Sequence, residues 1–240
     1  MTEIELTELS SDVGGSQPLH GYLATPTGDG PWPGVVVVHE AFGLDQVMRR
    51  QVDRLASAGF LALAPDLFSA GGARRCLVST MRAMMAGEGS AFADIAAAKS
   101  ALRRSGDCTG KIGIIGFCMG GGFALLSASH GYDAASPNYG MLPKDLDAAL
   151  ADACPLVASY GGRDLGLRGA AGKLTNALTR AGVVHDVKEY PRAGHAFLND
   201  APTGPKALRP LMRVAHIGPE PESAADAWRR IDAFFSLHLR

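Results

Sequence analysis

The sequence is poor in cysteine, and the spacing of its cysteines does not suggest disulfides. The four cysteines are Cys76, Cys108, Cys118 and Cys154. They form no CxxC pair and no framework typical of disulfide-rich proteins. We therefore expect a reducing compartment, the cytoplasm. The seven histidines are scattered, and no HExxH motif or Cys/His cluster offers a set of metal ligands. We expect neither a bound metal nor a cofactor.

An excess of charge of one sign is also absent. The 23 Lys+Arg and 24 Asp+Glu leave a formal net charge of -1, and 47% hydrophobic residues favour a soluble globular protein. Such a balance gives no general attraction to nucleic acid or to an anionic membrane, so we expect neither partner. No apolar run approaches the roughly 18 residues that span a bilayer. The acidic N-terminus, MTEIELTELSSDV, does not resemble a secretory signal. The oligomeric state stays open.

Short β-rich runs alternate with longer Ala- and Leu-rich segments, which is typical of an α/β protein with a mostly parallel central sheet flanked by helices. Residues 34–40 (GVVVVHE) and 111–117 (KIGIIGF) are apolar and β-branched, as expected of strands buried on both faces. Further strands are predicted at 60–65, 154–161 and 183–190. Helices are predicted at 45–58, 74–86, 90–105, 119–130, 168–181 and 222–238.

The remaining segments predict an edge hairpin and two irregular regions. The first 25 residues, with VGGSQ between two alternating stretches, indicate an antiparallel hairpin at the sheet edge. Residues 131–145 and 199–221 are expected to be irregular. Loops of this length are either walls and lids of a functional site or simply mobile. No internal repeat or low-complexity linker divides the chain, so we expect residues 1–240 to form a single domain.

The segment Gly116-Phe117-Cys118-Met119-Gly120 has the form G-x-C-x-G between a predicted strand and a predicted helix. Such a tight turn exposes its central side chain above the sheet, where the N–H groups of the following helix favour a thiolate and can stabilise an oxyanion. A buried, inert thiol is the alternative. A phosphate-binding loop is disfavoured, because neither GxxxxGK[ST] nor GxGxxG is present.

An aspartate and a histidine follow the cysteine in the order of a catalytic triad. Asp164 comes after the predicted strand that ends in Tyr160, and His195 comes after the predicted strand that ends in Tyr190. In this arrangement His195 would take the proton of Cys118, and Asp164 would orient the imidazole. Each alone could be a turn aspartate or an ordinary loop histidine. Their joint appearance in the required order favours the triad.

At these residues the sequence resembles the dienelactone hydrolase family of α/β-hydrolases, over nearly its whole length. The resemblance implies an α/β-hydrolase fold, with Cys118 as nucleophile, His195 as base and Asp164 as the acid member. It also implies that Glu40 contacts the resting thiol and is displaced by substrate; alternatively Glu40 is a solvated charge or a structural ion pair. The matching segments are VVVVHEAFGLD (35–45), GFLALAPDLF (59–68), GFCMGGGFAL (116–125), NYG (138–140), YGGRD (160–164) and YPRAGHAF (190–197).

The same resemblance assigns the surroundings of the nucleophile. The oxyanion would be held by the backbone N–H groups of Met119 and Ala41, while Phe42 and Tyr139 would be walls of the substrate pocket. Asn199 stands where the name-giving enzymes carry an arginine that binds the substrate's carboxylate. We therefore expect weak turnover of anionic dienelactones.

Other arginines remain candidates for binding a carboxylate. A counterpart of the family's second arginine is sought among Arg74, Arg75 and Arg82. The arginine missing at position 199 could be replaced by Arg192, Arg209 or Arg213, depending on how residues 199–221 fold. Each of the three could also be a solvated surface charge.

The leading hypothesis is a cysteine hydrolase that cleaves a small ester or lactone through an acyl-enzyme, with no cofactor or metal. One alternative is a broad-specificity carboxylesterase or thioesterase unrelated to dienelactone. Another is a protein of the same fold that binds a ligand, or senses redox state through Cys118, without turnover.

Overall fold

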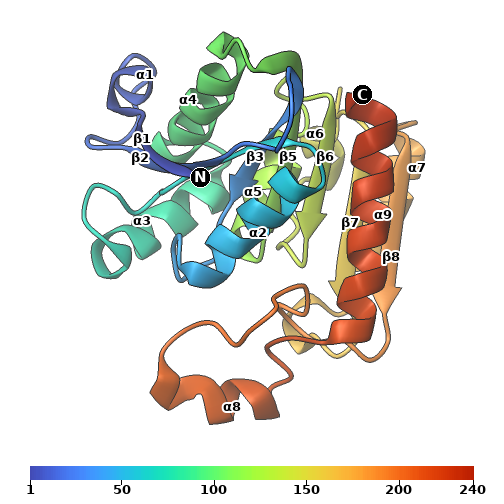
Figure 1. The fold of residues 1–240 in the computed structure, drawn as a ribbon. Helices are drawn as coiled ribbons and strands as arrows, with labels where there is room; N and C mark the ends of the chain where they lie inside the picture. The colour runs from blue at the N-terminus through green and yellow to red at the C-terminus, as the bar shows by residue number, and fades with distance from the viewer.

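The computed structural model describes all 240 residues and contains one eight-stranded sheet (Figure 1). The strand order is β1-β2-β4-β3-β5-β6-β7-β8. Strands β3 to β8 pair in parallel with one another. Strands β1 and β2 lie at one edge, where β1 pairs antiparallel with β2 and β2 pairs antiparallel with β4. The bounds are β1 (Thr2–Glu5), β2 (His20–Ala24), β3 (Trp32–Val38), β4 (Leu61–Pro65), β5 (Cys108–Phe117), β6 (Ala134–Asn138), β7 (Leu156–Gly161) and β8 (His185–Tyr190).

Helices cover both faces of this sheet (Figure 1). The longer ones are α2 (Gln46–Ser57), α3 (Ala73–Ala86), α4 (Ser90–Arg104), α5 (Met119–Ser127), α7 (Ala170–Arg180) and α9 (Pro221–Leu239). The short ones are α1 (Thr7–Ser11), α6 (Leu146–Ala149), α8 (Arg209–Val214) and the 3-10 turns η1 (Leu165–Leu167) and η2 (Lys206–Leu208). The predicted α/β class, with a mostly parallel sheet flanked by helices, is confirmed. None of the helices combines the length and the apolar character that crossing a bilayer requires.

The apolar strand β3 explains how one sheet supports two cores. Val36 and Val38 belong to a cluster of 33 buried residues that includes side chains of α4, α5 and α7. Val35 and Val37 point to the opposite face, into a cluster of 25 buried residues with α2 and α9. Because side chains alternate along a strand, burial on both faces requires the continuous valine run that the sequence shows.

The structure corrects three of the predicted segments. Residues 199–221 were expected to be irregular, yet η2 and α8 lie within them. Residues 131–145 were expected to be irregular, yet β6 lies within them, between β5 and β7. Its sequence AASPN carries Pro137, which lacks an N–H group for the sheet and so speaks against a central strand. The N-terminal antiparallel pair is present, but α1 stands between its strands in place of a tight turn.

The turn between β5 and α5 depends on glycines that allow backbones to touch. A Cβ atom on Gly120 would overlap the carbonyl oxygen of Val38 and lie 2.7 Å from that of His39. A Cβ atom on Gly121 would lie 2.5 Å from the carbonyl oxygen of Asn138. These obstacles are backbone atoms, which cannot rotate away as a side chain can. Helix α5 is thereby held directly against the ends of β3 and β6.

We predict that Gly120→Ala destabilises the protein by at least about 1–3 kcal/mol, because the added methyl group must push α5 away from β3. Gly172→Ala is the matched control, since Gly172 lies within α7 and nothing stands within 4 Å of its Cβ position. That variant should gain about 0.5–1 kcal/mol from higher helix propensity. Urea unfolding measures both; equal effects of the two variants would refute the packing argument.

Candidate active site

Cys118 occupies the turn between β5 and α5, in a backbone conformation that is unfavourable for a non-glycine residue. Its φ is 55° and its ψ is -115°, and it forms the N-cap position of α5. The backbone around it is fixed, because its N–H donates to the carbonyl oxygen of Asn138 (3.1 Å) and its own carbonyl accepts from Gly122 (3.2 Å). Strain of this kind costs on the order of 1–3 kcal/mol. The side chain is partly exposed at the positive end of the helix dipole.

His195 and Asp164 meet in loops that follow β8 and β7. The distance between His195 Nδ1 and Asp164 Oδ2 is 2.5 Å. The other carboxylate oxygen, Oδ1, accepts from the backbone N–H of Gly166 (3.1 Å). The two loops are joined by a hydrogen bond from the N–H of Arg163 to the carbonyl oxygen of Ala193 (2.9 Å). Asp164 is therefore held in one orientation and fixes the tautomer of the imidazole.

The surroundings favour the protonated form of His195. Burial lowers the pKa of this imidazole, but the hydrogen bond to Asp164 and the interaction with the Cys118 side chain outweigh it and raise the pKa to about 10. Cys118 and Asp164 thus both favour the charged form of the same ring. The three residues that the sequence assigned to a triad are brought together by the fold. The edge of the Tyr139 ring also faces this imidazole, with 5.2 Å between ring centroids.

Glu40 follows β3 and is a buried carboxyl group with three side-chain partners. The amide of Asn199 donates to both of its oxygens (3.1 and 3.2 Å). The hydroxyl groups of Thr203 and Tyr139 each lie 3.4 Å from one of them. Burial raises the pKa of Glu40 to about 7, against the opposing effects of nearby His195 and of the hydrogen bonds from Asn199 and Thr203. Its hydrogen bonds go to these three residues and none goes to Cys118.

His39 fixes the peptide group that links Glu40 to Ala41. Its Nδ1–H donates to the carbonyl oxygen of Glu40 (2.7 Å), which also accepts from the N–H of Gly43 (3.0 Å). The other ring nitrogen accepts from the N–H of Leu67 (3.0 Å), and burial lowers the pKa of His39. In a trans peptide the N–H points opposite to the C=O. The N–H of Ala41 is therefore directed away from His39, and it has no hydrogen-bond partner in the protein.

The three residues expected to contact substrate differ in accessibility. Phe42 is 40% exposed and packs beside Gly204. Tyr139 is fully buried, and Asn199, at 2% exposure, is engaged by Glu40. Sequence reasoning did not single out Thr203 or His39. No pattern marked Thr203, whereas His39 stood in a segment already compared with the family and could have been found there.

The site contains no cluster of metal ligands. No group of three or more His, Cys, Asp or Glu side chains is placed to hold a metal ion.

The sheet is mostly parallel, and a cysteine stands at the turn after β5, where a nucleophile is found in α/β-hydrolases. Asp164 and His195 follow the later strands β7 and β8. This arrangement defines an α/β-hydrolase fold. Within that class, the chain belongs to the dienelactone hydrolase family, whose model matches residues 19–239. The family resemblance, the fold and the assignment to the hydrolases are thereby confirmed.

Relatives and solved structures agree with this assignment. A Methylorubrum extorquens protein named "Putative carboxymethylenebutenolidase" is 31% identical over 232 residues, covering 89% of this chain and 75% of the relative. The "Carboxymethylenebutenolidase" of Pseudomonas putida is 31% identical, with 77% and 83% covered. The crystal structure of a "Putative Dienelactone Hydrolase" from Klebsiella pneumoniae has a TM-score of 0.77 and 27% identity, with 98% and 97% covered.

The buried Glu40 makes stability depend on pH. Since its pKa is raised from 4.5 to about 7, the folded state keeps a proton that the unfolded chain has released between these values. The free energy of unfolding should therefore fall as pH rises through this window, by roughly 3 kcal/mol from this group. In Glu40→Gln this part of the fall should disappear, whereas the exposed control Glu88→Gln should keep it. Urea unfolding from pH 4.5 to 8 measures this dependence. If the free energy of unfolding of Glu40→Gln falls with pH as steeply as that of the wild-type protein, the prediction is wrong.

Proposed function

We propose that this protein is a cysteine hydrolase that cleaves a small carboxylic ester or lactone through a Cys118–His195–Asp164 triad, with residues 1–240 acting as a single domain. The observation that carries the proposal is the 2.5 Å contact between His195 and Asp164, on an imidazole that also interacts with Cys118. Membership of the dienelactone hydrolase family supports the reaction type.

The reaction has two stages. The Cys118 thiolate attacks the carbonyl carbon, and the bond to the leaving oxygen breaks as the His195 imidazolium gives it a proton. Water, deprotonated by the neutral imidazole, then attacks the acyl-thioester, and breakage of the carbon–sulfur bond releases the acid. The raised pKa of His195 supports its role as the proton donor in the first stage.

The oxyanion of each stage would be held by two backbone N–H groups. One belongs to Met119, the first residue of α5, whose N–H has no partner within the helix. The other belongs to Ala41, which the hydrogen bonds of His39 and Gly43 to the preceding carbonyl orient. Preorganised donors of this kind are worth about 3–4 kcal/mol each in transition-state stabilisation. His39 is thus a positioning residue.

The identity of the substrate is narrowed by what surrounds Glu40. In the family Glu40 would contact the resting thiol, but here its carboxyl group is held by Asn199 and Thr203. The amide of Asn199 is therefore occupied by Glu40, and it cannot bind a substrate carboxylate as an arginine at this position would. This favours esters or lactones other than a simple anionic dienelactone, including those of a broad-specificity carboxylesterase.

Hydrolysis of p-nitrophenyl acetate tests the triad. We expect Cys118→Ala and His195→Ala to reduce kcat/KM by about 10³-fold or more, because nucleophile and base act as one unit. Cys76→Ala, which removes a thiol of α3 outside the proposed triad, should retain full activity. Unchanged rates in both triad variants would refute the proposal and favour a binding or sensing protein without turnover.

Alkylation by iodoacetamide tests the ion pair independently of turnover. Cys118 should react at least tenfold faster than Cys154 at pH 7, because burial raises the pKa of the Cys154 thiol to about 12. The preference should persist as pH falls to 6, since His195 stays protonated below its raised pKa. His195→Gln should slow labelling of Cys118. An equal rate in that variant would show that the imidazole does not activate the thiol.

A further inference from the structure

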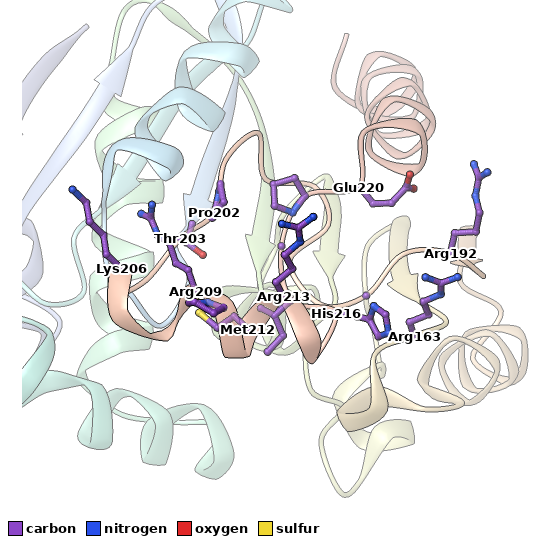
Figure 2. A pocket seen from close by; sticks show the side chains of 15 residues that line it. Arg163, Arg192, Pro202, Thr203, Lys206, Arg209, Met212, Arg213, His216 and Glu220 are labelled. Atoms are coloured by element: carbon purple, nitrogen blue, oxygen red, sulfur yellow. The ribbon is translucent and has the colours of Figure 1, made fainter.

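A cavity of about 930 Å³ lies beside the proposed active site, and five of the residues that line it are arginine or lysine (Figure 2). It opens between α8, η2 and the loops that follow β7 and β8. One carboxylate, that of Glu220, lines it. The basic residues are Arg163, Arg192, Lys206, Arg209 and Arg213.

Most of these charges have no partner within the protein. Arg192 pairs with Glu222, whereas the other four basic residues form no ion pair. Glu220 is engaged in capping α9, where its side chain accepts from the N–H of Ser223 (2.8 Å). The Nε atom of Arg209 is buried and has no hydrogen-bond partner. A buried donor without a partner costs free energy, so it points to a group that the isolated chain lacks.

The arrangement of the charges is unfavourable without a ligand. Arg209 and Arg213 lie four residues apart on α8, and like charges at this spacing destabilise a helix. Figure 2 shows both extending from α8, with Arg163 and Arg192 on the far side of the cavity. Concave walls of one charge sign concentrate the electric field and attract counter-ions. Guanidinium groups bind phosphate and carboxylate oxygens in pairs.

The cavity shares its walls with the proposed active site. Thr203 lines it and also interacts with Glu40. Gly194, which directly precedes His195, lines it, and so does Gly218, whose N–H donates to the carbonyl oxygen of His195 (2.9 Å). Arg163 directly precedes Asp164. A ligand bound there would lie against the outer side of the His195 loop.

We propose that this cavity binds a dianionic group of phosphate-monoester type carried by the substrate, outside the part that contains the scissile ester. The inference rests on the proposed esterase function for its link to turnover, but binding of the dianion does not. Four unpaired cations exceed what a single carboxylate needs, which favours a doubly charged group. The residues involved are separate from the position held by Asn199.

Binding of inorganic pyrophosphate by the whole protein tests the site directly. Isothermal titration at low ionic strength should show binding that weakens with added salt. The double variant Arg209→Gln/Arg213→Gln should lose at least tenfold in affinity. The matched control Arg103→Gln/Arg104→Gln removes the same charge from exposed positions on α4 and should stay within twofold. Absence of binding to the wild-type protein, or equal losses in both variants, would overturn the proposal.

A pair of aryl esters with the same acyl group, one neutral and one bearing a phosphate, links the site to turnover. In Arg209→Gln/Arg213→Gln, kcat/KM for the phosphate-bearing ester should fall at least tenfold, while that for the neutral ester stays unchanged. Equal effects on both esters would overturn the proposal. Failure of the wild-type protein to hydrolyse the neutral ester would instead refute the esterase function, and the pyrophosphate titration would still decide the anion site.

Discussion

The direct contact between helix α5 and the end of strand β3 is the constraint on which the site depends. No side chain separates Gly120 from the carbonyl groups of Val38 and His39. The turn that carries Cys118 and the loop that carries Glu40 and Ala41 therefore converge on one point. A wider spacing would separate the two backbone donors from the thiol, and with them the means to stabilise charge on a bound carbonyl oxygen.

The sequence predicts the convergence of Cys118, Asp164 and His195 because topology alone nearly dictates it. In a parallel sheet, residues that follow successive strands lie along one edge, so the loops after β5, β7 and β8 share it. The strand β6 is not predicted from the sequence, because Pro137 disfavours a central strand although the fold places it in one. Burial between two strands overrides local propensity there.

Features that depend on the fold of residues 199–221 were beyond sequence reasoning. Thr203 reaches Glu40 across 163 positions of the chain, and no spacing rule relates the two. The basic cavity is likewise formed by the loops after β7 and β8 together with η2 and α8. Its charged residues therefore lie in separate segments of the sequence. A balanced net charge of -1 concealed this local concentration. Composition limits the average field of a protein and says little about its local maxima.

The segment that carries α8 is joined to the proposed active site by the contact of Thr203 with Glu40 and by a small piece of sheet, an isolated bridge between His195 and Ile217. Figure 1 shows α8 projecting from the body of the protein beyond the ends of the strands. The end of this segment thus meets the backbone of the histidine itself, where the N–H of Gly218 donates to the carbonyl oxygen of His195 (2.9 Å). A displacement of α8 would therefore be transmitted to the backbone that positions the proposed base.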